Sequence, residues 1–210
     1  MDAKKVSKAL LGRLPAYLDY LKTLPEHTAN ISATRIAEAL GYGDVLVRKD
    51  LAKVSGSGRC KTGHQREVLI QNIEAFLDCS ETTNAVIVGA GKLGQALLDY
   101  SGFAESGLHI LSGFDIAPDK SKTTGGIQIL PMDKLADFCY EYHVHMAIIT
   151  VPAEHAQQVC DTLVSCGIEA IWNFAPVRLK VPAHILVQNE NLAVSLTALR
   201  MQLNARKKAK

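Results

Sequence analysis

The clearest candidate for a ligand-binding site is a short glycine-rich segment in the middle of the chain. It follows the apolar run 85–88 directly and consists of Gly89, Ala90, Gly91, Lys92, Leu93 and Gly94. A G-x-G-x-x-G sequence between a strand and a helix is the fingerprint of dinucleotide-binding folds, in which the helix N-terminus binds the pyrophosphate. Gly89 permits the tight turn, Gly91 lets the backbone approach the ligand, and Gly94 lets the helix pack closely on the strand.

A carboxylate follows where the ribose of such a cofactor is expected. Asp115 comes after the next apolar strand pattern, about twenty residues beyond Gly94. A carboxylate at this position accepts hydrogen bonds from the ribose hydroxyls of NAD and repels a 2′-phosphate. The sequence therefore predicts NAD(H) rather than NADP(H) as the cofactor.

Two later segments are expected at the same edge of the sheet. The first contains Thr150, Val151 and Pro152, and the second contains Asn173, Phe174, Ala175 and Pro176. Each lies at the end of a predicted strand, and ligands of open α/β sheets bind outside the carboxyl ends of the strands. We therefore expect both segments to contribute to the cofactor site.

No catalytic or metal-binding residue is predicted around this site. A dehydrogenase needs a proton donor and a substrate pocket beside the nicotinamide, but the nucleotide fold occupies residues 81–190, which contain no Tyr-x-x-x-Lys. His143 and His145 form an isolated pair without a third ligand, as is typical of surface histidines. A dinucleotide site without an evident proton donor or substrate pocket favours a sensor protein over an enzyme.

The elements that must position this site alternate between strands and helices. Apolar runs predict strands near 85–89, 108–114, 127–130, 146–151 and 168–173, and helices are expected near 92–100, 132–142 and 153–166. This alternation is typical of a parallel sheet. The expected fold class is α/β, with a Rossmann-type doubly wound sheet behind a separate N-terminal domain.

The N-terminal domain is predicted to consist of short helices. The apolar spacing predicts helices near 14–24 and 66–78, and Ser32 and Gly41 have the residue types that begin and end another helix between them. A third short helix is expected to be capped by Asp44, to bury Val47, Leu51 and Val54, and to expose Arg48, Lys49 and Lys53. Two short helices around a glycine-containing turn are the helix-turn-helix pattern.

A glycine-rich stretch after these helices predicts a wing. Residues 55–63 are too rich in glycine for a helix and contain two cations, Arg59 and Lys61. In a winged helix, the third helix places Arg48 and Lys49 at the major groove, while the wing reaches phosphates or the minor groove. The alternative is a generic three-helix domain whose lysines and arginines are merely solvated.

Composition limits the other possibilities. The chain has 210 residues, 48% of them hydrophobic, so it is long enough for one large or two small domains. It contains no uncharged apolar run long enough to span a membrane and no signal-peptide pattern, which favours a cytoplasmic protein. Its five cysteines lack a C-x-x-C spacing, as expected for reduced thiols.

The charges are unevenly distributed along the chain. Residues 1–80 contain 12 lysines and arginines against 9 acidic residues, residues 81–199 contain 6 against 12, and residues 200–210 contain 5 against none. A basic front and an acidic middle suggest two domains with different partners. A basic end can meet a polyanion such as double-stranded DNA, and the alternative is an ordinary solvated surface. The terminal helix has a single apolar stripe before its basic end, formed by Leu192, Leu196, Leu199 and Leu203. Such a helix docks either on its own domain or on a partner subunit.

Several motifs together give a resemblance that extends over nearly the whole chain. They are Arg13-Leu14-Pro15, Val47-Arg48-Lys49-Asp50-Leu51, the Gly89 to Gly94 segment, Gly113-Phe114-Asp115, Thr150-Val151-Pro152-Ala153, Gly167-Ile168 and Asn173-Phe174-Ala175-Pro176. With them the chain resembles the Rex family of bacterial redox-sensing transcriptional repressors. The resemblance implies a homodimer with a winged-helix domain (1–80), a Rossmann NAD(H)-binding domain (81–190) and a swapped C-terminal dimerisation helix with a basic tail (191–210).

The resemblance also implies how the protein is regulated. Typical members bind a palindromic operator and release it when NADH binds, while NAD⁺ competes and permits DNA binding. Tyr100 matches a tyrosine that lies by the nicotinamide pocket and takes part in the switch. The family's acidic switch residue falls at Asn191 and its basic partner at Asp19, so we expect altered discrimination between NADH and NAD⁺.

DNA recognition departs from the family pattern as well. The sequence Ala52-Lys53-Val54-Ser55 replaces the family's Ser-Tyr-Phe-Gly, and the wing lacks the usual aromatic residues, so DNA specificity is expected to differ. Two alternative functions remain open at this point. One is a family paralogue that responds to thiol oxidation at Cys60, whose neighbouring cations would favour a thiolate. The other is a small NAD-dependent oxidoreductase.

Overall fold

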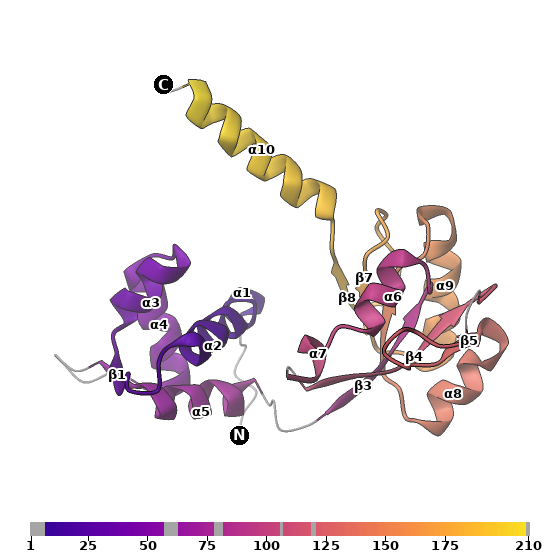
Figure 1. Cartoon of the computed structure of the whole chain (residues 1–210), viewed down its shortest axis with the longest axis horizontal. Helices are drawn as coiled ribbons and strands as arrows, with labels where there is room; N and C mark the ends of the chain where they lie inside the picture. Colours follow the sequence, from indigo (N-terminus) through magenta and orange to yellow (C-terminus); the bar gives the residue numbers. More distant parts are fainter. Residues whose placement is uncertain (1–6, 57–62, 78–81, 106, 119–120, 209–210) are drawn as a thin grey trace. The chain divides into compact units, whose positions relative to one another are not determined.

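The computed structural model describes residues 7–56, 63–77, 82–105, 107–118 and 121–208. The chain divides into two compact units, residues 1–81 and 82–210 (Figure 1). Each unit has a hydrophobic core of its own, and the core of the first shares no residue with the cores of the second.

The first unit consists of helices and one short pair of strands. Its helices are α1 (Lys8–Leu11), α2 (Leu14–Thr23), α3 (Ala33–Leu40), α4 (Asp44–Ser55) and α5 (Arg66–Phe76). Strand β1 (Asn30–Ile31) pairs antiparallel with β2 (His64–Gln65). The core is formed mainly by fully buried side chains of these helices, among them Leu14, Tyr17, Leu21, Ile36, Val47, Leu51, Leu69 and Ile73.

The signals at the start and end of α3 act as the sequence predicts. The Ser32 hydroxyl accepts a hydrogen bond from the Arg35 N–H at 3.1 Å, and Gly41 closes the helix at φ +69°. The predicted cap of α4 is wrong, because Gly43 is the N-cap and Asp44 is already the first helical residue. The Asp44 carboxylate instead accepts a hydrogen bond from the Thr34 hydroxyl at 2.8 Å, so a contact between helices replaces the local cap.

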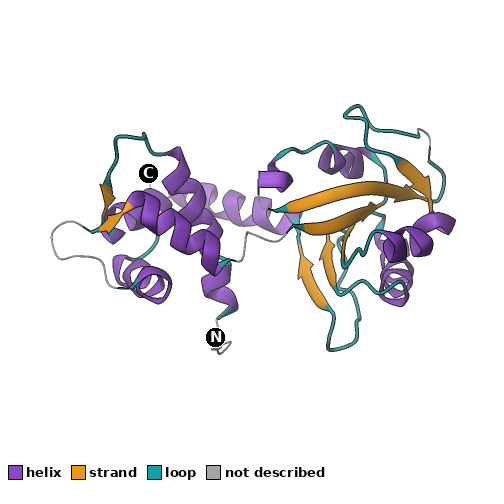
Figure 2. Cartoon of the chain, turned by 90° about the horizontal axis from the view of Figure 1, so that it is seen from below, coloured by secondary structure: helices purple, strands orange, loops and turns teal. Residues whose placement is uncertain are grey.

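The second unit contains a six-stranded sheet in which every pairing is parallel (Figure 2). The strands are β3 (Thr83–Val88), β4 (Leu108–Asp115), β5 (Ile129–Pro131), β6 (Met146–Ile149), β7 (Ala170–Asn173) and β8 (Leu186–Asn189). Their order is β5-β4-β3-β6-β7-β8, so the chain runs outward from β3 in one direction and then returns to β6. This is the doubly wound order with its switch point between β3 and β6, and it confirms the predicted fold class.

Helices cover both faces of this sheet. They are α6 (Lys92–Leu98), α7 (Gly102–Glu105), the 3-10 turn η1 (Met132–Lys134) with α8 (Leu135–Glu141), and α9 (Ala153–Ser165). The last helix, α10 (Leu192–Lys208), follows β8 and belongs to neither layer. Val86 and Val88 point to the face packed by α8 and α9, while Ile87 points to the face packed by α6. This alternation along β3 is what a strand buried on both faces requires.

Helix α10 differs from the others because its described side chains are exposed. Its leucines and other large apolar side chains are about half to two-thirds exposed, namely Leu192, Val194, Leu196, Leu199, Met201 and Leu203. The predicted stripe is therefore left uncovered by the described residues of its own unit. No helix in the described part of the chain is long and apolar enough to cross a membrane.

Candidate functional site

The glycine segment forms a turn. At two positions of this turn, only glycine fits. Gly89 has φ +102°, and a Cβ there would lie 2.9 Å from backbone atoms of Thr150 and Val151. A Cβ on Gly94 would collide with the carbonyl oxygen of Gly89. The strand, the turn and helix α6 are thus packed as closely as the dinucleotide fingerprint requires.

The start of α6 is open to a ligand. Gly91 is the N-cap residue, it has no side chain to cap the helix, and a Cβ there would meet nothing within 4 Å. The first N–H groups of a helix have no partner inside the helix, and their positive partial charge attracts anions. This end of α6 therefore suits a pyrophosphate.

Asp115 is connected directly to the same turn. It is the last residue of β4, and its carboxylate accepts hydrogen bonds from the Ala90 N–H at 2.7 Å and the Ala117 N–H at 3.0 Å. The prediction placed Asp115 after the strand, but its side chain reaches the expected edge of the sheet. A carboxylate held here lies beside the glycine turn, where a ribose attached to the pyrophosphate would be.

Thr150 links the turn to the strand on the other side of the switch point. Its hydroxyl donates a hydrogen bond to the Gly89 carbonyl at 2.6 Å, and the Thr150 N–H donates to the Val88 carbonyl at 2.9 Å. The end of β3 is therefore fixed to the end of β6. This link holds the turn in place at the edge where open α/β sheets bind ligands.

A cavity of about 440 Å³ opens between these groups. Six residues predicted to bind the cofactor line it, namely Gly89, Gly91, Asp115, Thr150, Val151 and Pro152. The lining also includes residues that the sequence analysis missed: Val88, Ile116, Met132, His155, Gln158, Val159 and Thr162. The last four recur on one face of α9, and this helical spacing directly after Pro152 is a signal that could have found them.

Four predicted residues belong to the turn and the first part of α6 but do not line this cavity, namely Ala90, Lys92, Leu93 and Gly94. Ala90 donates its N–H to Asp115 and accepts a hydrogen bond from the Gln95 side chain at 2.7 Å. Lys92 and Leu93 are exposed at the start of the helix. Their contribution to a ligand site would come from their backbone N–H groups.

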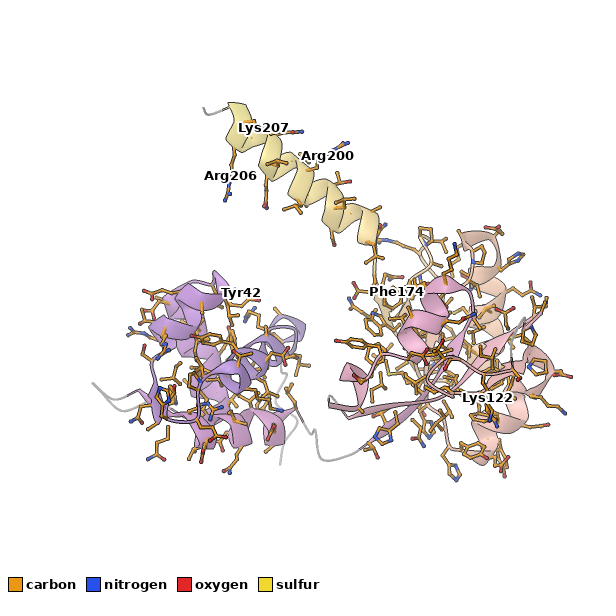
Figure 3. The ribbon with its side chains drawn as sticks, viewed as in Figure 1. Tyr42, Lys122, Phe174, Arg200, Arg206 and Lys207 are labelled. Atoms are coloured by element: carbon orange, nitrogen blue, oxygen red, sulfur yellow. The ribbon has the colours of Figure 1, made fainter. Side chains whose placement is uncertain are left out.

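The segment after β7 is not brought to the cavity. Asn173 is fully buried, and its amide donates hydrogen bonds to the Val177 carbonyl at 2.8 Å and to the Asn189 side chain at 2.9 Å. Its oxygen accepts the Ala175 N–H at 3.0 Å, so this side chain builds the turn. Phe174, labelled in Figure 3, packs against Trp172 with ring centroids 4.7 Å apart. Neither Ala175 nor Pro176 lines the cavity.

Tyr100 also lies outside this cavity. Its ring is 58% exposed and packs edge-on against Phe103, whose ring in turn meets Trp172. It contributes to a second cavity of about 360 Å³ beside α7 and the start of β4. The structure therefore separates Tyr100 from the glycine turn within one chain.

In the first unit, helix α4 presents the predicted cations. Arg48, Lys49 and Lys53 are exposed, whereas Val47 and Leu51 are fully buried. Arg48 forms an ion pair with Asp44 at 3.0 Å, so binding a base edge would require it to exchange that carboxylate. The predicted wing cations Arg59 and Lys61 lie outside the described residues, as does Cys60.

An ion pair between the partly exposed Arg13 and the buried Asp50 joins α4 to the residue that precedes α2. Arg13 donates from Nε to one oxygen of Asp50 at 2.7 Å and from Nη2 to the other at 3.0 Å, and the Tyr17 hydroxyl donates to the first oxygen at 3.0 Å. The hydrogen bond to Asp50 raises the pKa of Arg13 above its ordinary value. Burial, with a smaller effect of Asp50, raises the pKa of Tyr17 to about 12.

The two positions that the resemblance matches to the family's switch lie on the surface. Asp19 is exposed on α2. Asn191 precedes α10, and its side-chain oxygen accepts the Val194 N–H at 3.1 Å, which is the hydrogen bond of an N-cap. Asparagine at this position thus keeps a capping oxygen without a charge.

Two of the three described thiols are poorly suited to redox sensing. Cys139 and Cys160 are buried, and burial raises the pKa of Cys139 to about 11 and raises that of Cys160 as well. A raised pKa keeps a thiol in its unreactive protonated form. Among the described cysteines, only Cys166 is partly exposed.

Comparison with known proteins finds relatives along the full chain. Residues 5–52 match the family described as putative DNA-binding protein N-terminus, and residues 80–177 match the CoA binding domain family. The redox-sensing transcriptional repressor Rex of Bacteroides fragilis is 39% identical over 205 residues, covering 97% of this chain and 93% of the relative. Rex of Treponema denticola is 40% identical over 212 residues, covering 99% and 100%.

Solved structures of similar proteins include two ligand complexes. The crystal structure of RSP in complex with beta-NADH superimposes with a TM-score of 0.87 at 33% identity and covers 99% of this chain and 100% of that one. RSP in complex with beta-NAD+ and operator DNA gives the same TM-score and identity and covers 97% of this chain and 95% of that one.

Proposed function

The chain belongs to the Rex family of redox-sensing transcriptional repressors, and we propose that NAD(H) bound at its glycine turn controls the binding of α4 to operator DNA. Members of this family are repressors and not enzymes, so the dinucleotide acts as a signal. The alternative of a small oxidoreductase is set aside on this ground.

The cofactor site rests on one observation above all. The Ala90 N–H and the Asp115 carboxylate are hydrogen-bonded at 2.7 Å, so the glycine turn and the ribose-binding carboxylate form one unit. The backbone at the start of α6 would hold the pyrophosphate, and Asp115 would accept hydrogen bonds from the ribose. The oxidation state of the bound nicotinamide supplies the redox signal.

The adenosine half fits the cavity beside α9. Apolar side chains such as Ile116, Val151 and Val159 form much of its wall, and an aromatic base is largely apolar on its faces. His155 and Gln158 offer hydrogen-bonding groups on the same wall. The remaining positions implied by the family resemblance, Tyr100 and the segment 173–176, would then act from outside this cavity.

The DNA-binding site is proposed on the exposed face of α4. Arg48, Lys49 and Lys53 lie on this face, opposite the buried Val47 and Leu51. A helix of this kind docks in the major groove, where arginine and lysine read guanine edges or bind phosphates. We assign 1–80 as the DNA-binding domain, with Arg59 and Lys61 as wing residues, 81–190 as the NAD(H)-binding domain and 191–210 as the dimerisation segment.

The exposed stripe of α10 supports a homodimer. Leu192, Leu196 and Leu199 are each more than 60% exposed, and a helix that exposes a continuous apolar stripe is stabilised when a partner covers it. A two-fold dimer would match a palindromic operator, because the symmetry of the protein and that of the site coincide. A repressor that acts on chromosomal DNA would reside in the cytoplasm.

Two binding measurements on the intact protein test this function. NADH binding is followed by the change in its own fluorescence, and DNA binding by the anisotropy of a labelled palindrome from the promoter region of the gene. The proposal predicts saturable NADH binding and a preference for the palindrome over a scrambled duplex. Failure of either measurement would overturn the corresponding half of the proposal.

A further inference from the structure

Asp50 is the one charged residue of the described helix α4 that is buried. It is 3% exposed, and its two oxygens together accept three hydrogen bonds, two from the Arg13 guanidinium and one from the Tyr17 hydroxyl. All of these donors belong to α2 or to the residue immediately before it. Asp50 directly follows Lys49, one of the exposed cations of the proposed DNA-binding face.

The geometry of this contact restricts rotation of α4. Val47 and Leu51 hold the helix by apolar contacts, which are not directional and allow small rotations. The two parallel hydrogen bonds from Arg13 are directional, because a planar guanidinium meets a planar carboxylate in one orientation. A rotation of α4 about its axis would break this pair.

Tyr17 adds a second restraint at the other end of the helix. Its ring meets that of Tyr42 edge-on with centroids 5.8 Å apart, and Tyr42 lies in the turn just before α4. The same side chain therefore contacts the turn that precedes α4 and, through its hydroxyl, Asp50 in the second half of the helix. Tyr42 is labelled in Figure 3.

Stability alone is a weak reason for such a buried pair. The side chains of Asp50 and Arg13 are only 4% and 18% exposed, so removing most of their charge from water is costly, and apolar residues of similar volume often replace such a pair with no loss of stability. What an apolar replacement does not supply is a fixed orientation. The pair could only stabilise the fold, or it could set the direction of α4. Variants of the pair are expected to behave differently in these two cases.

We propose that Arg13, Tyr17 and Asp50 are positioning residues that fix the direction in which α4 presents Arg48, Lys49 and Lys53 to DNA. Contacts to base edges need correct geometry, whereas phosphate contacts tolerate small rotations. The network therefore determines how well the protein distinguishes its operator from other DNA. This inference rests on the proposed function of α4.

The test compares three variants of the full-length protein. Arg13→Met/Asp50→Leu replaces the ion pair with apolar side chains, Arg13→Lys keeps the charge but loses the planar fork, and Tyr17→Phe removes one hydrogen bond. The control is Lys22→Gln/Glu74→Gln, which removes an exposed ion pair of 2.9 Å between the same α2 and helix α5. Circular dichroism verifies that the helices of the first unit are kept in each variant, and NADH binding verifies that the second unit is intact.

The readout is the ratio of affinities for the operator and for a scrambled duplex at one salt concentration. We expect this ratio to fall by about tenfold in the double variant, the size of effect expected from one disturbed base contact. The Arg13→Lys and Tyr17→Phe variants should show smaller losses, while affinity for scrambled DNA stays unchanged. The control pair should keep the ratio of the wild type.

The outcomes separate this inference from the proposed function. A wild-type protein without operator preference would overturn the proposed function and the positioning role with it. Folded variants that keep the wild-type ratio would overturn the positioning role alone, as would an equal loss in the control. If the double variant does not fold, Arg13→Lys and Tyr17→Phe decide the question by the same ratio.

Discussion

The backbone N–H of Ala90, inside the glycine turn, donates a hydrogen bond of 2.7 Å to the carboxylate of Asp115 at the end of β4. The two residues are 25 positions apart in the sequence, and they meet because β3 and β4 are adjacent parallel strands that end at the same edge. This contact places the expected pyrophosphate-binding and ribose-binding groups side by side.

The first prediction concerns cofactor choice. The Asp115→Asn variant keeps an oxygen for the Ala90 N–H but loses the charge that repels a 2′-phosphate. We expect the ratio of NADH to NADPH affinity to fall by about tenfold, which corresponds to about 1.4 kcal/mol. Fluorescence titrations with the two cofactors measure this ratio. The matched variant Asp133→Asn, at an exposed carboxylate in η1, should leave it unchanged, and an equal shift in both variants would refute the role of Asp115.

The second prediction concerns stability at alkaline pH. The pKa of Tyr17 in the folded protein is raised to about 12 from an ordinary value of 10.0, so folding favours the protonated phenol. Its contribution to stability is complete below pH 10 and disappears as the pH rises toward 12. Urea unfolding at pH 9 and at pH 11.5 should show a smaller loss of stability in Tyr17→Phe than in the wild type. The same loss in both proteins would contradict the assignment.

The third prediction tests the dimer. Leu199→Glu introduces a charge into the exposed apolar stripe of α10, and we expect it to convert the dimer into a monomer. Operator affinity should fall because a single half-site is bound, while NADH binding remains. Ala198→Glu, which by its spacing lies about 100° around the helix from Leu199 and outside the leucine stripe, is the control. Light scattering after size-exclusion chromatography measures the mass, and a Leu199→Glu protein with the mass of a dimer would be incompatible with the proposed interface.

The fourth prediction concerns the substituted switch positions. The family resemblance implies a cation and a carboxylate at the positions of Asp19 and Asn191, so we expect this chain to discriminate less between NADH and NAD⁺ in releasing DNA. Asp19→Arg/Asn191→Asp should increase that discrimination, and aspartate at 191 still caps α10. The NADH and NAD⁺ concentrations that release half of the operator measure the effect. No change in their ratio would show that these positions do not set the discrimination.

Much of the fold follows from local signals in the sequence. The glycine turn, the Ser32 and Gly41 helix ends, and the strands near Asp115 and Thr150 are specified by residues close together in the chain. The short helices α1 and α7 were missed because each has only four residues. Strand β8 was missed because it lies at the sheet edge, where three of its four side chains are exposed and no apolar alternation marks it.

The site was less predictable where distant residues decide the environment. Asn173 ends a strand at the correct edge, but its amide is satisfied by Val177 and by Asn189, which comes from β8. Asp44 has the residue type of a helix cap, yet Thr34 on another helix attracts its carboxylate. The pairing of Arg13 with Asp50, 37 residues apart, has no local signal at all.

The proposed control of operator binding by NAD(H) is tested most directly by measuring whether nucleotide binding and DNA binding are coupled. The labelled palindrome is bound to the wild-type protein and titrated separately with NADH and NAD⁺ while its anisotropy is followed. We predict that NADH releases the DNA and that NAD⁺ requires a higher concentration or has no effect. Tight operator binding that neither nucleotide changes, in a protein that demonstrably binds NADH, would contradict it.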